Sequence, residues 1–388
     1  MSNIIDYMKW RSDITFSQIG INDIDCLIFS ELAYLPLEGV VPSLDDGKYI
    51  MLVDAVHKFF NIHKDGISVG AIIPDQIIGL FKHAGRTNRF ADVKMWGYVN
   101  DVDLSQEKQF SAVCFTIDDG TTYVAYRGTD DSIVGWKEDF NMAIYTPIPA
   151  QKEALDYLEK MHKKIKGPII VGGHSKGGNL AVYSSINASS SVKKRTVKIY
   201  NFDGPGFKDN FISHSDTNTI DKIINILPES SIIGRIFDIV GRYEIVNSVN
   251  KGIMQHDAFS WSVMASDFVY APEFTAQSDE FHILLKKWVS KMSKDEVVDI
   301  IETLHKVMTN SNVTALSDIT SDKFKFILNI LKSDTEDKKT IWNGFKKLIS
   351  EKYFGDKQNA KKSAKFQISK EENMQIDGFD DGEIVDLQ

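Results

Sequence analysis

The residues best able to do chemistry lie in one stretch, Gly173-His-Ser-Lys-Gly177, where an apolar run meets glycines and presents a serine. The apolar run 169–171 precedes this turn, and apolar residues follow it at helical spacing. A strand, a tight turn and a helix are therefore predicted. The pentapeptide fits the G-x-S-x-G nucleophile elbow, and Gly178 adds a third small residue where a Cβ would collide with nearby backbone. We interpret Ser175 as a nucleophile for acyl groups.

A serine nucleophile needs a histidine as general base, which in α/β-hydrolases follows the serine and the acid in the chain. Four of the nine histidines come after Ser175. Of these, His282 and His305 lie in helical patterns, and His214 lies in a polar run. His256 follows the last β-rich segment, where the loop that carries the base is expected. We therefore predict that His256 is the base.

The acid that orients the base has several candidates. Asp203 ends a predicted strand and enters the loop Gly204-Pro-Gly206, which could aim a carboxylate at the edge of the sheet. Glu229 follows the next strand, a position that some hydrolases use, and Asp238 in a predicted helical segment is a weaker candidate. The sequence favours Asp203, with Glu229 left open as the alternative.

The oxyanion of the reaction needs two backbone donors, one of them the N–H that follows the nucleophile, at Lys176. The second should come from the polar loop after the strand that ends near Tyr126. The Lys176 side chain is expected to point into solvent, the alternative being contact with an anionic part of the substrate. For Arg127, in the same polar loop, we expect a structural ion pair with Asp139.

The elements around these residues change in character along the chain. Residues 1 to about 90 read as mostly helical, and short β-rich runs begin at Lys94. A hairpin is predicted over 110–126 around Asp118-Asp-Gly120, and a helix over 149–166 leads into the elbow strand. Further strands are predicted at 197–202 and 220–227. This alternation predicts an α/β-hydrolase fold, a mostly parallel sheet with helices on both faces.

The C-terminal part of the chain has no strand pattern. Ser293 and Glu296 form a capping box before an apolar helical stripe, and two further stripes follow over 324–331 and 341–349. We predict three regions: an α/β-hydrolase domain with a helical N-terminal part over 1–270, a helical appendage over 271–350, and a charged, disordered tail over 351–388.

Composition excludes several classes of protein. The formal net charge is −9, of which −7 comes from the tail segment 371–388, so the rest is near neutral and a nucleic-acid partner is not expected. The two cysteines, Cys26 and Cys114, lie in apolar stretches, so we expect buried thiols and no disulfide framework. No secretory signal or membrane span is visible, and a cytoplasmic protein is expected.

Two motifs together resemble the class three (fungal-type) triacylglycerol lipases. They are the elbow pentapeptide and Ala125-Tyr-Arg-Gly-Thr129, which is followed by Trp136 and Asp139. This resemblance implies that Thr129 supplies the second oxyanion donor, beside Lys176. Two features depart from that family, since Gly135 stands where an aspartate is usual and no Asp-x-Val-Pro follows the strand ending at Leu227.

The chain as a whole is similar to a largely uncharacterised bacterial family of lipase-like proteins. The residues that carry this resemblance include Trp10 and the segments 22–30, 201–207 and 255–257. The Asp203 loop also resembles the acid-bearing loop of pancreatic-type lipases, which again favours Asp203 as the acid.

The function predicted from these residues is a serine hydrolase of the esterase or lipase type, with the triad Ser175, Asp203 and His256. Its substrate would be a small-molecule or lipid acyl ester, with no cofactor and no metal. Contact of the C-terminal helices with a membrane surface is a further possibility, and the oligomeric state is left open. The alternative is a catalytically silent hydrolase fold that binds a partner.

Overall fold

The structure is a computed structural model of the chain. The residues that it describes are 2–64, 74–103, 108–129, 138, 141–142, 145–208, 211, 217–290, 293, 295–299 and 302–303. The two stripes predicted over 324–331 and 341–349, and the tail predicted over 351–388, lie outside the described residues. The capping box is present, because Ser293 and Glu296 each accept a hydrogen bond from the other's backbone N–H.

The described residues form one main sheet of eight strands, whose order across the sheet is their order in the chain. Strands β1 to β4 pair antiparallel, and β4 to β8 pair parallel. The bounds are β1 Ile50–Met51, β2 Lys94–Asp103, β3 Lys108–Thr116, β4 Thr122–Tyr126, β5 Ile169–His174, β6 Thr196–Phe202, β7 Ile223–Pro228 and β8 Arg242–Val246. The hairpin predicted around Asp118-Asp-Gly120 is therefore the β3–β4 pair.

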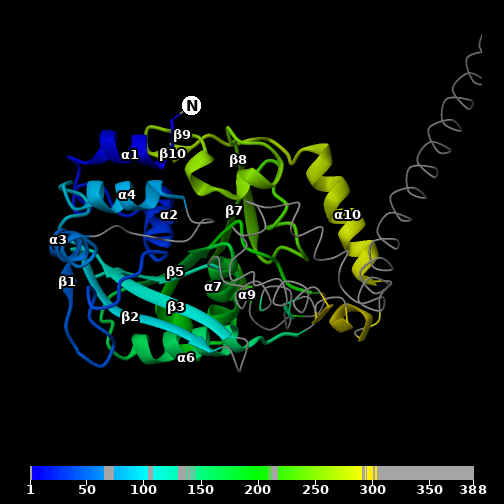
Figure 1. Cartoon of the computed structure of the whole chain (residues 1–388), viewed down its shortest axis with the longest axis horizontal. Coiled ribbons are helices and arrows are strands. Elements are labelled where there is room, and N and C mark those ends of the chain that lie inside the picture. Colours follow the sequence, from blue (N-terminus) through cyan, green and yellow to red (C-terminus); the bar gives the residue numbers. More distant parts are fainter. Residues whose placement is uncertain are drawn as a thin grey trace, which may run out of the picture.

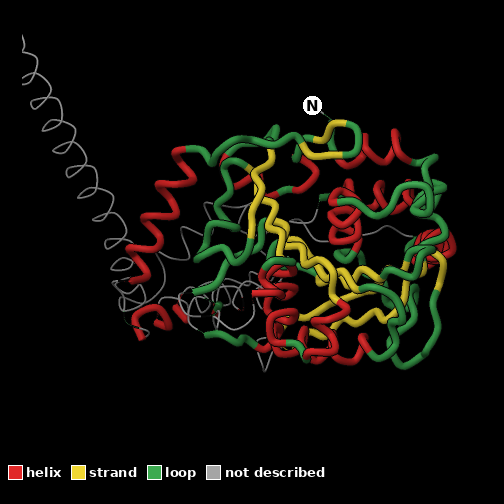
Figure 2. Tube along the Cα trace, turned by 180° about the vertical axis from the view of Figure 1, so that it is seen from behind, coloured by secondary structure: helices red, strands yellow, loops and turns green. Residues whose placement is uncertain are grey.

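Helices cover both faces of this sheet (Figures 1 and 2). One face is covered by the N-terminal helices α1 Ile4–Arg11, α2 Asp23–Leu32, α3 Leu52–Ile62 and α4 Gln76–Ala84. The other face carries the helices between parallel strands, α6 Pro149–His162, α7 Lys176–Asn187, α8 Ser190–Arg195 and α9 Thr217–Ile220. This is the predicted α/β-hydrolase fold. Its parallel half holds the elbow.

Strand β4 shows how the sheet separates two cores. Its side chains alternate, so that Tyr123 and Ala125 belong to the core under the N-terminal helices and Val124 and Tyr126 to the core under α6 and α7. All four are fully buried, which explains the near-continuous apolar run of this strand.

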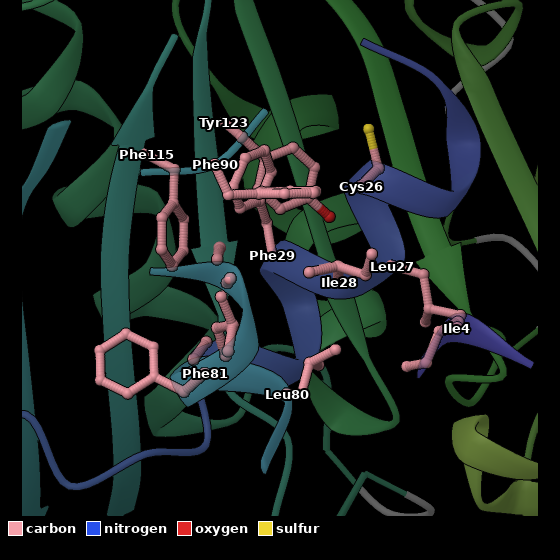
Figure 3. Close-up of a cluster of buried hydrophobic side chains, with 14 of the residues drawn as sticks. Ile4, Cys26, Leu27, Ile28, Phe29, Leu80, Phe81, Phe90, Phe115 and Tyr123 are labelled. Carbon is pink, nitrogen blue, oxygen red and sulfur yellow. The ribbon is translucent and has the colours of Figure 1, made fainter. Parts of the chain in front are cut away.

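The core beneath the N-terminal helices is rich in aromatic rings that pack against one another (Figure 3). The ring of Phe29 on α2 lies 4.7 Å from that of Phe115 on β3 and 5.7 Å from that of Tyr123 on β4. Such ring pairs add about 0.5–1.5 kcal/mol each beyond the area they bury. The sequence predicts that this region is mostly helical, and it indicates no catalytic or binding residue there.

The two cysteines lie on opposite sides of the sheet. Cys26 belongs to the core under the N-terminal helices and Cys114 to the other core, and both thiols are free and buried. Burial raises the pKa of the Cys114 thiol to about 12 and that of Cys26 well above its usual value. Both are therefore protonated, unreactive core residues, as predicted.

The chain after β8 closes the end of the molecule near the N-terminus (Figure 1). It contains two short 3₁₀ turns, η1 Gly252–His256 and η2 Ala258–Ser260, and the strand pair β9 Val263–Met264 and β10 Asp267–Phe268. The Val263 N–H donates to the Ser2 carbonyl at 2.8 Å, so the N-terminus holds this segment in place. Helix α10 Ala276–Ser290 then packs on the loop after β7, where Ser278 Oγ donates to the Ser231 carbonyl.

No helix in the described part of the chain is both long enough and apolar enough to cross a membrane.

Candidate active site

Ser175 occupies a strained turn between β5 and α7, as the elbow pattern predicts. Its φ is +57° and its ψ is −133°, a conformation that a residue with a Cβ rarely adopts. The small neighbours are required by close packing, since a Cβ on Gly173 or Gly177 would lie 2.4 or 2.1 Å from the Tyr126 carbonyl oxygen. The turn is held by a 2.9 Å hydrogen bond from the Ser175 N–H to the Phe202 carbonyl.

His256 lies at the end of η1 and is paired with Asp203. Its Nδ1 is 2.7 Å from Asp203 Oδ2, and its side chain is 25% exposed while that of Asp203 is 1% exposed. The carboxylate can only accept here, so Nδ1 carries the proton in this contact. No hydrogen bond joins Nε2 to Ser175 Oγ in the described part of the chain. Such bonds often tighten only when substrate binds.

Asp203 has a backbone φ of +47° and stands directly after β6. Its second oxygen, Oδ1, accepts hydrogen bonds from Ser231 Oγ and, at 3.2 Å, from the Gly234 N–H. With His256, three donors face one buried carboxylate, which offsets the cost of burying its charge. Asp203 is thus built into a site for an ionised acid.

The other two candidate acids lie elsewhere. Glu229 has its backbone N–H bonded to the Val246 carbonyl and its own carbonyl bonded to Thr275, and its carboxylate does not bond His256. The helix predicted around Asp238 is wrong, because this residue forms an isolated β-bridge with Phe207. Through this bridge, Asp238 pairs with the loop that follows β6. The Asp238 carboxylate accepts a hydrogen bond from Lys286 of α10.

Of the other late histidines, His282 is described. It lies on α10, and its Nδ1 is 2.8 Å from the Arg235 carbonyl, which is a structural contact. His214 and His305 lie outside the described residues. Among the described candidates, His256 is the histidine that the fold brings to the elbow.

The two predicted oxyanion donors follow two neighbouring strands of the sheet. Lys176 is the first residue of α7, and Thr129 follows β4, whose last residue Tyr126 pairs in register with Gly173 of β5. The loop after β4 packs tightly against the elbow, because a Cβ on Gly128 would lie 2.7 Å from the His174 carbonyl oxygen. Glycine therefore lets the Thr129 loop approach the elbow. Gly135, Trp136 and Asp139, which follow it, lie outside the described residues.

The side chain of Lys176 contradicts the sequence-based expectations. It is 1% exposed, and its Nζ lies 2.9 Å from Glu138 Oε2 and 3.2 Å from both the carbonyl and the side-chain oxygen of Gln109. It neither points into solvent nor is free to meet substrate. The reason is Glu138, a fully buried acid that also accepts from the Gln109 and Ala150 N–H groups. No local signal links residues 38 positions apart.

Arg127, directly after β4, donates through Nη2 to Oδ1 of Asn100 on β2 at 3.0 Å. It is buried, which agrees with a structural role. The pairing expected with Asp139 involves a residue outside the described part of the chain.

His174, immediately before Ser175, is a site residue that sequence reasoning missed. Its Nε2 lies 2.9 Å from the His256 carbonyl oxygen, and the two imidazole rings stack at 4.6 Å between centroids. On its other side, Nδ1 lies 3.2 Å from Tyr34 Oη and 3.4 Å from Glu31 Oε1. The variable position of the pentapeptide gave no signal, but an acid within the apolar run of α2 could have suggested a buried polar cluster.

Burial makes this cluster neutral. Loss of solvent lowers the pKa of His174 well below its usual value, and loss of solvent raises the pKa of Glu31 well above its own. The raised Glu31 value also reflects the negative charge of Asp257. We therefore describe Glu31 and His174 as an uncharged contact rather than an ion pair.

Comparison with known proteins adds a family to this geometry. Residues 84–306 match the model of the Mbeg1-like family, more than half of the chain. The chain belongs to the Mbeg1-like family. The recognition of a lipase-like α/β-hydrolase is thereby confirmed. The Mbeg1-like match includes Ser175, Asp203 and His256, whereas Glu31 and Tyr34 precede it.

Among solved structures, the Mbeg1-like chain is similar to lipase II from Rhizopus niveus, with 17% identity and a TM-score of 0.30. The similarity covers 39% of this chain and 66% of that lipase, just under two thirds of its length. No curated protein matches the chain.

Proposed function

We propose that the protein is a serine hydrolase of the esterase or lipase type, which cleaves a carboxylic ester through an acyl-enzyme intermediate. The observation that carries this proposal is the 2.7 Å contact of His256 with Asp203 at the end of the sheet where Ser175 occupies its strained turn. A nucleophile, a base and an oriented acid are the parts that acyl transfer requires.

The proposed reaction uses these groups in order. Ser175 Oγ attacks the ester carbonyl while His256 Nε2 takes its proton, and the N–H groups of Lys176 and Thr129 stabilise the oxyanion. The ester C–O bond breaks as His256 returns the proton to the leaving alkoxide. Water, deprotonated by His256, then attacks the acyl-enzyme and releases the carboxylic acid and free Ser175. Asp203 holds the imidazole tautomer throughout.

The acyl chain and the alcohol are the open variables of the substrate. A small-molecule ester and a lipid ester present the same carbonyl to Ser175, and thioesters and amides use the same machinery. A panel of p-nitrophenyl esters of increasing chain length would measure the preference directly. Each step of the proposed reaction needs only protein groups and water.

Fluorophosphonate labelling tests the proposal without knowledge of the substrate. We expect covalent labelling of the wild-type chain and none of Ser175→Ala, because the reagent traps an activated serine. Ser190→Ala on the exposed face of α8 is a matched control that removes a serine hydroxyl away from the site, and it should still label. No labelling of the wild type, or equal labelling of Ser175→Ala, would overturn the enzyme proposal in favour of a silent, partner-binding fold.

The acid is tested by Asp203→Asn beside Glu229→Gln. Asparagine at 203 would donate to His256 Nδ1 and stabilise the wrong tautomer, so kcat should fall by roughly 10⁴-fold. The Glu229 variant should stay within about threefold of wild type, since its carboxylate does not contact His256. The reverse pattern in ester hydrolysis would move the acid to Glu229.

A further inference from the structure

The residue before the nucleophile holds the loop that carries the base. A carbonyl oxygen can only accept, so the 2.9 Å contact between His174 and the His256 carbonyl requires the proton to be on His174 Nε2. Face-to-face stacking of the two rings adds a second contact between the same residues. The position of the base therefore depends on a side chain anchored beside Ser175 itself.

His174 is in turn held from the N-terminal layer. With the proton on Nε2, the neutral ring presents the Nδ1 lone pair to Tyr34 Oη, whose hydroxyl donates at 3.2 Å. That hydroxyl also packs against the oxyanion loop, because a Cβ on Gly128 would lie 2.0 Å from it. One buried chain of contacts thus joins α2, the oxyanion loop, the elbow and the base loop.

Other side-chain contacts of the base loop are made by the residue before His256. Gln255 bonds the Ser230 N–H and the Asn250 carbonyl, and its own carbonyl accepts from Trp261. These contacts secure the residue before the base. The His256 carbonyl is contacted by His174, 82 positions away in the chain.

We propose that His174 is a positioning residue that fixes His256 for its reaction with Ser175, through the Nε2–H donor to the His256 carbonyl. This inference rests on the proposed hydrolase function. The role of His174 is to set the distance between the base His256 and the nucleophile Ser175. A displacement of about 1 Å at such a site can lower a rate by roughly 10²-fold.

Two amide variants separate the contribution of each ring nitrogen. In His174→Gln the side-chain amide reaches the level of Nε2 and can still donate to the His256 carbonyl. In His174→Asn it ends at the level of Nδ1, facing Tyr34, and cannot reach that carbonyl. His57→Asn on the exposed face of α3 makes the same substitution away from the site.

The readouts are the rate of fluorophosphonate labelling and the kcat and KM of ester hydrolysis on full-length protein. We expect His174→Asn to lose roughly 10- to 100-fold in kcat and labelling rate with KM little changed, and His174→Gln to recover most of that loss. His57→Asn should match wild type. Equal losses in the Gln and Asn variants, or wild-type rates in the Asn variant, would overturn the inference. An unreactive wild type would instead overturn the proposed function, and this inference with it.

A measurement on the wild type covers the case in which the variants do not fold. Ring ¹⁵N chemical shifts distinguish a protonated from an unprotonated imidazole nitrogen. We expect His174 to be a neutral ring with its proton on Nε2, whereas a proton on Nδ1 would contradict the proposed donor.

Discussion

The two neighbours of Ser175 in the chain, His174 and Lys176, are both buried ionisable residues, yet their surroundings differ. Lys176 lies on the α6 side of the sheet as a charged partner of Glu138, at 2.9 Å. His174 lies on the α2 side, beside a Glu31 carboxyl that is 3.4 Å away and uncharged. The number of hydrogen-bond donors around each acid explains this difference in charge. Glu138 accepts from Lys176 and two backbone N–H groups, whereas Glu31 Oε1 has no hydrogen-bond partner.

Both side chains contact a residue from a distant segment of the chain. His174 holds the His256 loop, and Lys176 holds Glu138, which comes nine residues after the predicted donor Thr129. This difference predicts that removing Lys176 from its charged pair with Glu138 lowers the stability of the protein. Replacing the uncharged Glu31 by glutamine should not lower it.

The largest expected effect is that of Lys176→Met. This change keeps the backbone N–H but leaves Glu138 buried without its cation, which should lower the free energy of unfolding by about 3–5 kcal/mol. Urea unfolding followed by circular dichroism measures it.

The matched control is the double variant Lys176→Met with Glu138→Leu, which removes both charges. It should recover most of the stability, because a buried pair replaced by apolar residues is often neutral. If the single variant is as stable as wild type, the buried pair is not the anchor described above.

An intermediate effect is expected for Glu31→Gln, and it should depend on pH. The folded-state pKa of Glu31 is raised, so its contribution to stability is full below the unfolded value of 4.5 and is lost as pH rises through the folded value. Glutamine does not ionise. The variant should therefore gain on the order of 1 kcal/mol over wild type at pH 8, with little difference at pH 4. Unfolding free energies measured at both pH values test this, and a variant that loses stability at pH 8 would indicate a charged Glu31.

The smallest effect is expected at an exposed ion pair, which gives the baseline for the other two. Lys286 and Asp238 lie 2.9 Å apart with side chains 54% and 41% exposed. Lys286→Ala should change the unfolding free energy by about 0.5 kcal/mol or less, because solvent screens such pairs. A cost as large as that of Lys176→Met would show that burial is not what separates the pairs.

Local patterns explain how much could be predicted from the sequence. The elbow at Ser175, the hairpin before Tyr126 and the helix that starts at Pro149 each follow from glycines, turn residues and apolar spacing within about fifteen positions. That helix ends at His162, four residues before the predicted end. The pairing of Asp203 with His256 was also expected, since chain order and strand ends restrict the candidates. Their catalytic roles remain predictions.

Long-range contacts explain what could not be predicted. The general exposure of lysines predicts a solvated Lys176 side chain, whereas its partner Glu138 lies in a separate segment of the chain. The contact between Tyr34 and His174 spans 140 positions, from the turn that follows α2. Such contacts depend on which helix covers which face, and periodicity alone does not supply that information.

The N-terminal helices have a consequence for how this protein can be dissected. The family similarity begins at residue 84, yet Phe115, Tyr123 and Ile170 on the sheet are covered by helices that lie before it. A fragment cut at that boundary would present these rings and aliphatic groups to water as one continuous apolar sheet face, and we expect it to aggregate. The segment that matches the family model is thus shorter than the segment that must be expressed for the protein to fold.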